Sequence, residues 1–237
     1  MSTIVCVHGA FRGGWSFERV RSALVADGHD VRTPSLTGMG DRSHIHPDHV
    51  PLSMWIDDVV SLLTLSDLRN VILVGHSQGG LVATAVSGRC PERLSQLVFV
   101  DAVEPEHGQR GVDLMGGAPP TLPPATTWIP PTPLDSGSGL DRDDIAWVNE
   151  RLGATPLGPS LDPVDLSHPE AGSIPRRRLF CSGTPATYPS SFARRGLEAQ
   201  GAEMTIVDEP HDVLISAPAL VARFILELRT LNHRDGG

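Results

Sequence analysis

Short apolar runs alternate along the chain with stretches whose apolar residues recur every three or four positions. The runs predict strands at 4–7, 31–34, 71–74, 97–100, 179–181 and 204–207. Most of these runs are apolar at every position rather than at every second one. Strands of that kind are typical of a parallel sheet buried between two layers of helices. The pattern therefore predicts an α/β fold with a mostly parallel, doubly wound sheet.

The periodic stretches predict helices between these strands. They cover residues 16–27, a stretch from Ser53 to about 63, and residues 81–87, 141–152 and 218–228. In the first helix, Phe17, Val20 and Leu24 share one face, and Gly28 ends it. We expect the Ser53 side chain to cap the second helix.

The middle of the chain has a different composition. Eight prolines stand between Pro105 and Asp135, and five more between 156 and 175. Proline at this density excludes long helices and central strands. Because Trp128 and Trp147 need a surface to pack on, we expect this part to fold over the sheet. The predicted organisation is a core made of 1–102 and 178–237, with 103–177 inserted as a small helical lid.

Charge and composition exclude several classes of protein. The 237 residues include 19 basic and 28 acidic side chains, for a net charge of −9. An acidic chain without a basic run is a poor candidate for nucleic acid or an anionic membrane as partner. All the basic residues are arginine. The absence of lysine excludes Schiff-base catalysis, a pyridoxal-phosphate anchor and a P-loop.

The three cysteines are isolated. Cys6, Cys90 and Cys181 form neither a disulfide framework nor a zinc pattern. We expect no metal and no organic cofactor. No apolar run approaches the roughly 18 residues of a membrane span, and the first residues do not resemble a secretion signal. The expected protein is cytoplasmic, and a monomer or a homodimer.

One glycine-rich turn has the sequence of a catalytic motif. Residues 75–79, Gly-His-Ser-Gln-Gly, match G-x-S-x-G directly after an apolar strand and before a helix. That context indicates a nucleophile elbow, which lifts Ser77 above the sheet edge at a helix N-terminus; an ordinary Gly/Ser turn is the alternative. A serine nucleophile needs a base. His211 follows the last strand, where chains with this elbow place it, although it could be a plain loop histidine.

A second loop predicts the groups that would bind the oxyanion. His8-Gly9-Ala10 follows the first strand. Chains with the elbow place one oxyanion-hole N–H in this loop and one on the residue after the serine, here the amides of Ala10 and Gln78. We expect His8 to hold the loop by hydrogen bonds rather than to transfer protons. The candidates for substrate contact are Gly9, Phe11, Met115 and Trp128, although plain packing accounts equally well for the last three.

These segments together resemble a known group of enzymes. Residues 8–17, His-Gly-Ala-Phe-Arg-Gly-Gly-Trp-Ser-Phe, are similar to a loop of the small α/β-hydrolases in the methyl-esterase and hydroxynitrile-lyase family. Matching segments are 26–31, 33–44, 71–80, 98–105, 179–181 and 210–212. The resemblance covers roughly 1–105 and 178–228. It implies an α/β-hydrolase fold and a serine hydrolase that cleaves a small-molecule ester, such as a methyl ester or lactone, through an acyl-enzyme.

The chain departs from this family at two places. The lyases carry a hydroxylated residue where this chain has Gly9, and they use a lysine, which argues against cyanohydrin cleavage. The family's acid follows the fifth strand in a Cys-Thr-x-Asp-like segment. Here that segment is Cys181-Ser182-Gly183-Thr184-Pro185, so Thr184 stands at the acid's place and carries no charge.

Because Thr184 cannot be the acid, we predict Asp101 in that role. It ends the apolar run 97–100, which forms the neighbouring strand in the expected order. Some α/β-hydrolases, haloalkane dehalogenases among them, place the acid after that strand and four residues before a proline. Pro105 stands four residues after Asp101. Glu104 as the acid, and His211 acting in a dyad without an acid, are the open alternatives.

Two other functions remain open from the sequence. The same fold supports enzymes that do not hydrolyse, such as lyases, cyclases and decarboxylating enzymes, because fold does not fix function. Some hydrolase-like proteins are ligand receptors without catalysis. The complete elbow and His211 favour the serine esterase over the receptor.

Overall fold

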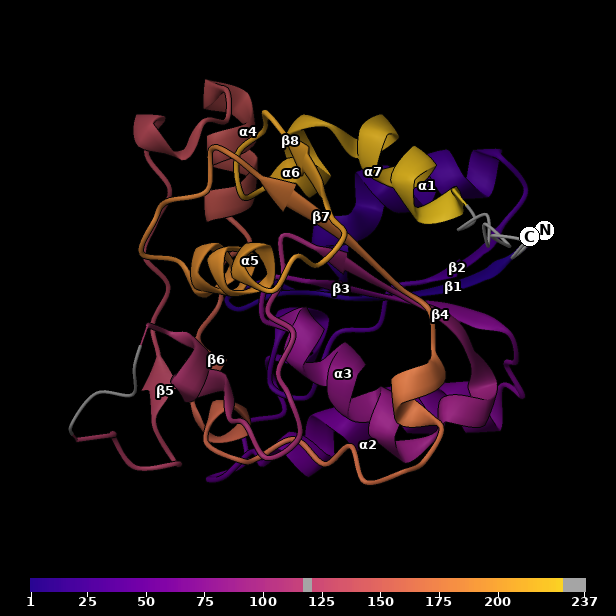
Figure 1. Cartoon of the computed structure of the whole chain (residues 1–237). Coiled ribbons are helices and arrows are strands. Elements are labelled where there is room, and N and C mark those ends of the chain that lie inside the picture. Colours follow the sequence, from indigo (N-terminus) through magenta and orange to yellow (C-terminus); the bar gives the residue numbers. More distant parts are fainter. Residues whose placement is uncertain (117–120, 228–237) are drawn as a thin grey trace.

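The computed structural model describes residues 1–116 and 121–227, and within them six parallel strands form the central sheet (Figure 1). Their order is β2-β1-β3-β4-β7-β8. The strands are β1 (Thr3–Val7), β2 (Asp30–Arg32), β3 (Val71–His76), β4 (Leu94–Val100), β7 (Arg176–Cys181) and β8 (Thr205–Val207). Every pairing in this sheet is parallel. The predicted fold class is confirmed.

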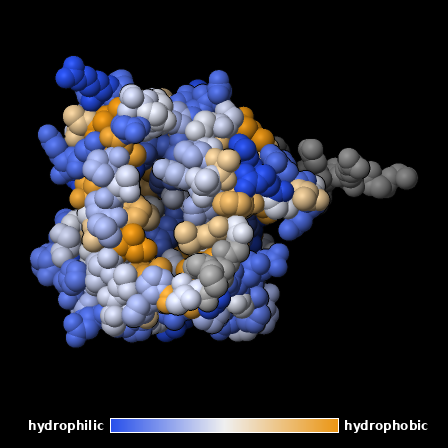
Figure 2. All heavy atoms as spheres, turned by 90° about the vertical axis from the view of Figure 1, so that its left-hand side faces the viewer, coloured by the Kyte–Doolittle hydropathy of each residue, from blue (hydrophilic) through white to orange (hydrophobic). Residues whose placement is uncertain are grey.

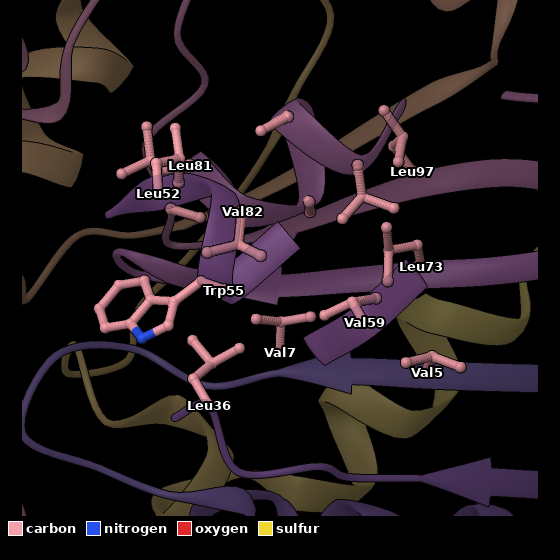
Figure 3. Packing of buried hydrophobic residues seen from close by; sticks show 14 of the residues in the cluster. Val5, Val7, Leu36, Leu52, Trp55, Val59, Leu73, Leu81, Val82 and Leu97 are labelled. Carbon is pink, nitrogen blue, oxygen red and sulfur yellow. The ribbon is translucent and has the colours of Figure 1, made fainter. Parts of the chain in front are cut away.

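Helices cover both faces of the sheet (Figure 1). On one face lie α1 (Glu18–Ala26), α6 (Val213–Ser216) and α7 (Pro218–Leu226); on the other lie α2 (Leu52–Leu65) and α3 (Gly79–Arg89). Successive strand side chains point to opposite faces, so a strand buried on both sides must be apolar throughout. In β1, Ile4 and Cys6 pack toward α1 and α7, whereas Val5 and Val7 pack toward α2 and α3 (Figure 3).

The start of α2 corrects one prediction. The helix begins at Leu52 with Pro51 at the cap position, and no side chain caps it, so the expectation that Ser53 is the cap was wrong. The Leu52 amide instead donates to the Asp162 carboxylate at 2.8 Å. A residue 110 positions away thus satisfies one of the free amides at the helix start.

The C-terminal third contains a helix that the sequence did not predict. This helix, α5 (Pro189–Ala199), has only two large apolar side chains, Phe192 and Leu197, so few residues mark its apolar face. The last helix is present as predicted but ends at Leu226. Its expected end at residue 228, and the tail from 232, lie outside the described residues. No helix in the described part of the chain is long and apolar enough to cross a membrane.

The proline-rich segment 103–177 contains an antiparallel pair, β5 (Trp128–Ile129) and β6 (Thr155–Pro156), and one helix of eight residues, α4 (Arg142–Asn149). Its earlier described part, which includes β5, α4 and β6, lies beyond the carboxyl ends of the sheet strands (Figure 1). Its last part runs back along α3, where Asp165 lies against Gly88, to the start of β7 at Arg176. Trp147 of α4 packs edge-on against Trp15, with ring centroids 5.2 Å apart. The segment therefore packs on the core, and its role as a lid stays a prediction.

Candidate active site

The turn between β3 and α3 holds Ser77 in a conformation that few non-glycine residues adopt. Its φ is +53°, in the left-handed region. The Ser77 amide donates to the Val100 carbonyl at 3.3 Å, and the Ser77 carbonyl accepts from the Val103 amide at 3.1 Å. Gly79 allows the close approach of chains, because a Cβ there would lie 2.2 Å from the Val7 carbonyl oxygen. The strained turn is thus fixed from both β1 and β4.

Three predicted site residues form a continuous hydrogen-bonded chain. The Nε2 atom of His211 lies 3.1 Å from the Ser77 hydroxyl oxygen, and its Nδ1 atom lies 2.5 Å from a carboxylate oxygen of Asp101. The three follow the carboxyl ends of three different parallel strands: Ser77 lies in the β3–α3 turn, Asp101 directly after β4, and His211 in the loop between β8 and α6. The Asp101 side chain is 1% exposed and that of His211 is 13% exposed. This spacing suits a nucleophile, a base and an orienting acid.

The Asp101 carboxylate is held by the segment that follows β7. It accepts hydrogen bonds from the Cys181 amide at 3.1 Å, the Thr184 hydroxyl at 2.6 Å and the Ser190 hydroxyl at 3.3 Å. Burial raises the pKa of Asp101, but the hydrogen bond and charge of His211 and these donors outweigh it, so the pKa lies below its usual range. Thr184, which stands where the resemblance places the acid, thus donates to Asp101, directly after the neighbouring strand β4.

The alternative acid, Glu104, is engaged elsewhere. Its buried carboxylate pairs with Arg176 at 2.8 Å and with Arg178 at 2.5 Å, both on β7. A carboxylate held by two guanidinium groups in this way has its lone pairs occupied. The structure therefore brings Asp101 to His211, and it brings Glu104 to the arginines.

The loop after β1 has a fixed peptide orientation. The His8 Nε2 atom accepts from the Leu36 amide at 3.0 Å, so its Nδ1 carries the proton and donates to the Gly9 carbonyl at 2.9 Å. Burial lowers the pKa of His8 to about 4, so the ring is neutral. The prediction that His8 holds this loop is confirmed. In a planar trans peptide, the N–H of Ala10 points away from the Gly9 carbonyl and hence away from His8.

The two predicted oxyanion amides are free donors. No hydrogen bond among the described residues uses the amide N–H of Ala10 or of Gln78. Gln78 is the N-cap residue of α3, where the first amides have no partner within the helix. Gly9 packs directly against the elbow, since a Cβ on it would lie 2.7 Å from the Ser77 Cβ. The missing side chain allows this close approach of the loop after β1 to Ser77.

Figure 2 shows a hollow on the face of the molecule where the strands have their carboxyl ends. The remaining predicted contact residues differ in exposure and in their neighbours. Phe11 is partly buried, with φ +62°. Trp128 stacks on His46 with ring centroids 3.7 Å apart, and Met115 is 52% exposed. Their contact with a substrate stays a prediction. A separate surface groove of about 480 Å³ along α2 contains none of these residues.

Comparison with known proteins identifies the family. The family model described as the alpha/beta hydrolase family matches residues 4–224. The chain belongs to this family. The carbendazim hydrolyzing esterase of Nocardioides sp. (strain SG-4G) is 32% identical over 246 residues, covering 96% of this chain and all of that one. The putative chloroplastic methylesterase 11 of Arabidopsis thaliana is 28% identical, covering 96% of this chain and 64% of that one.

A solved relative shows the same fold. The methylesterase MES16 from Arabidopsis superposes with a TM-score of 0.78 at 23% identity, covering 95% of this chain and 98% of that one. The predicted resemblance to small methyl-esterase-like hydrolases is therefore confirmed. The prediction that the protein is an ester-hydrolysing enzyme is also confirmed as a class of activity, since the relatives are named esterases.

Two contacts of this alpha/beta hydrolase join the His211 loop to the rest of the site, and both were missed from the sequence. The Asp212 carboxylate accepts two hydrogen bonds from the Nη2 atom of Arg12, at 2.8 and 3.0 Å, within a buried ion pair. His76 Nε2 donates to the His211 carbonyl at 3.0 Å. Burial and the charge of His211 lower the pKa of His76 to about 4, so this ring is neutral. The sequence marks Arg12, His76 and Asp212 only by their position, because each is the direct neighbour of a predicted site residue.

Replacing Arg12 by methionine should lower the free energy of unfolding by about 3 kcal/mol, because it leaves the buried Asp212 carboxylate without its partner. Burial raises the pKa of Asp212, and the charge of Arg12 is the largest influence that lowers it. Urea denaturation measures the change. The double variant R12M/D212L should regain most of the loss, because it buries no charge. A single variant as stable as the wild type would contradict a stabilising role of the pair.

Proposed function

We propose that the protein hydrolyses a carboxylic ester of a small molecule with a small leaving alcohol, such as methanol, through an acyl-enzyme on Ser77. The observation that carries the proposal is the chain of hydrogen bonds from the Ser77 hydroxyl through His211 to Asp101, at 3.1 and 2.5 Å. Relatives named methylesterases support the leaving group.

The proposed reaction uses the residues as follows. His211 Nε2 takes the hydroxyl proton while Ser77 Oγ attacks the acyl carbon, and the carbonyl electron pair moves to the oxygen. The amides of Ala10 and Gln78 donate to this oxyanion, an effect worth about 3 kcal/mol per donor. The C–O bond to the alcohol then breaks, and His211 delivers its proton to that alcohol. Water repeats the sequence and releases the acid.

Asp101 has the role of orienting acid in this proposal. Its carboxylate accepts from His211 Nδ1, which keeps Nε2 unprotonated and facing Ser77, and its charge stabilises the imidazolium that forms. The lowered pKa keeps Asp101 ionised at neutral pH. A dyad without an acid would leave this buried carboxylate without a function in the reaction.

The insertion and the loop after β1 would form the substrate pocket. Gly9 lets the loop after β1 lie directly beside Ser77, because any side chain there would collide with the Ser77 Cβ. Phe11, Met115 and Trp128 would supply apolar contacts. With no lysine in the chain, the lyase alternative lacks the cation that the family's lyases use.

The wild-type protein should release methanol from small methyl esters and lose this activity after reaction with one equivalent of a fluorophosphonate. Mass spectrometry should place the adduct on the peptide that contains Ser77. Cleavage of a cyanohydrin, with no ester turnover, would support the lyase alternative instead. Binding of esters without turnover or adduct would support a receptor.

A further inference from the structure

We propose that Thr155 is a positioning residue that fixes the orientation of the Ala10–Phe11 peptide beside the predicted oxyanion hole; this inference rests on the proposed function. The Thr155 hydroxyl oxygen accepts the Phe11 amide at 2.6 Å, and the Phe11 carbonyl accepts the Gly153 amide at 3.1 Å. Thr155 is 3% exposed. A segment of the insertion, 144 residues from Phe11 in the chain, thus holds both backbone groups of this residue.

The backbone at Phe11 needs such support. Its φ of +62° is unfavourable for a side chain with a Cβ, so it persists only where surrounding contacts enforce it. On one side, His8 fixes the Gly9 carbonyl. On the other, Arg12 is fixed by its bidentate pair with Asp212. If the backbone at Phe11 relaxed, the Ala10–Phe11 peptide between the Gly9 carbonyl and Arg12 would therefore rotate. This peptide adjoins the Ala10 amide.

Thr155 itself lies on a stiff support. It belongs to β6, where it pairs with Ile129 of β5, and the Leu157 amide donates to the Thr127 carbonyl at 2.9 Å. A hydrogen bond from a paired strand holds its partner more tightly than one from a loop free to move. The hydroxyl is thus placed by the sheet pair and not by Phe11.

The same short segment reaches the second predicted oxyanion residue. The Gln78 side chain donates to the Ser160 hydroxyl at 2.8 Å. The Gln78 backbone is already held by α3, since its carbonyl accepts the Leu81 amide at 3.0 Å. Thr155 should therefore matter more than Ser160. Residues 153–160 act as a fixed brace of the site, whatever other parts of the insertion do during substrate entry.

The variant T155V tests the brace, because it removes the acceptor with little change in volume. We expect kcat for ester hydrolysis to fall about 10- to 100-fold with KM changed less than about threefold, since oxyanion donors act mainly in the transition state. The variant T155S keeps the hydroxyl and should restore kcat to within about threefold of the wild type. The matched control is T84V: Thr84 is fully buried, and its hydroxyl has no hydrogen-bond partner among the described residues.

The outcomes separate this inference from the proposed function. A wild type that hydrolyses esters, with T155V within about twofold of its kcat, would overturn the brace alone. Equal losses in T155V and T155S would also overturn it, because the hydroxyl would then be irrelevant. A wild type without ester turnover would overturn both proposals. If T155V does not fold, T155A takes its place, and the Phe11 amide NMR signal must shift in T155A and not in T155S.

Discussion

The variant Ser77→Ala should lower kcat for ester hydrolysis about 10⁶-fold and lose all labelling by a fluorophosphonate, as removal of the nucleophile does in a serine protease. No other hydroxyl can take over, because the His211 Nε2 atom faces the Ser77 oxygen at 3.1 Å. The remaining rate should come from substrate binding and the oxyanion amides alone. Labelling is read by gel fluorescence, and kcat by release of the alcohol.

A matched control excludes a loss of fold as the cause. Ser87 lies on α3, the helix that follows the Ser77 turn, is fully buried and donates to the Thr84 carbonyl at 2.7 Å. Ser87→Ala removes a hydroxyl of the same kind without touching His211, so it should keep both labelling and kcat. Labelling that persists in Ser77→Ala would show that the probe reacts at another residue, and the proposed nucleophile would be wrong.

The fold was predictable because its signal is local and repeated. Strands apolar on both faces and helices with one apolar face are readable in short windows, and they order the chain into a parallel sheet. The elbow is readable for the same reason: strand, G-x-S-x-G turn and helix are contiguous at 71–89. The order of strands then points to Asp101 and His211 as neighbours of Ser77, although they lie 24 and 134 residues away.

Contacts that join distant segments were not predictable. The amide at the start of α2 finds its acceptor in Asp162, and Phe11 finds its acceptor in Thr155. Neither acceptor has a sequence pattern that marks it, because a single hydroxyl or carboxylate in a proline-rich segment is consistent with plain solvent exposure. Thr184 shows the same limit: its position in the chain is recognisable, whereas its role as a donor to Asp101 requires the structure.

The Asp101 carboxylate and the groups that hold it follow two different strands, β4 and β7. The carboxylate comes from the end of β4, while the amide and hydroxyls that hold it come from Cys181, Thr184 and Ser190, which follow β7. Burial raises the pKa of Asp101, but the imidazole of His211 and the donors Thr184 and Cys181 favour the charged form enough to lower it. In the proposed mechanism the acid can therefore follow β4, although the resemblance places it after β7, because the segment after β7 supplies the donors that hold the carboxylate.

The variant Asp101→Asn should accordingly lower kcat between about 10²- and 10⁴-fold while KM changes little, as the matching change does in a serine protease. The asparagine is similar in size but has no charge to stabilise the imidazolium. It can also present its amide N–H to His211 Nδ1, which selects the wrong tautomer and leaves Nε2 unable to take the Ser77 proton. Thermal melting should show a folded protein, because the amide oxygen can still accept from Cys181 or Thr184.

Two controls distinguish Asp101 from the other carboxylates. Asp58→Asn changes a nearly buried carboxylate that accepts from Thr37 and Arg42, away from His211, and should leave kcat unchanged. Glu104→Gln tests the alternative acid and should lower thermal stability rather than kcat, because Glu104 pairs with two arginines. A wild-type kcat in Asp101→Asn would mean that Ser77 and His211 act as a dyad. A loss of kcat in Glu104→Gln and not in Asp101→Asn would identify Glu104 as the acid. That result would contradict the contact between Asp101 and His211.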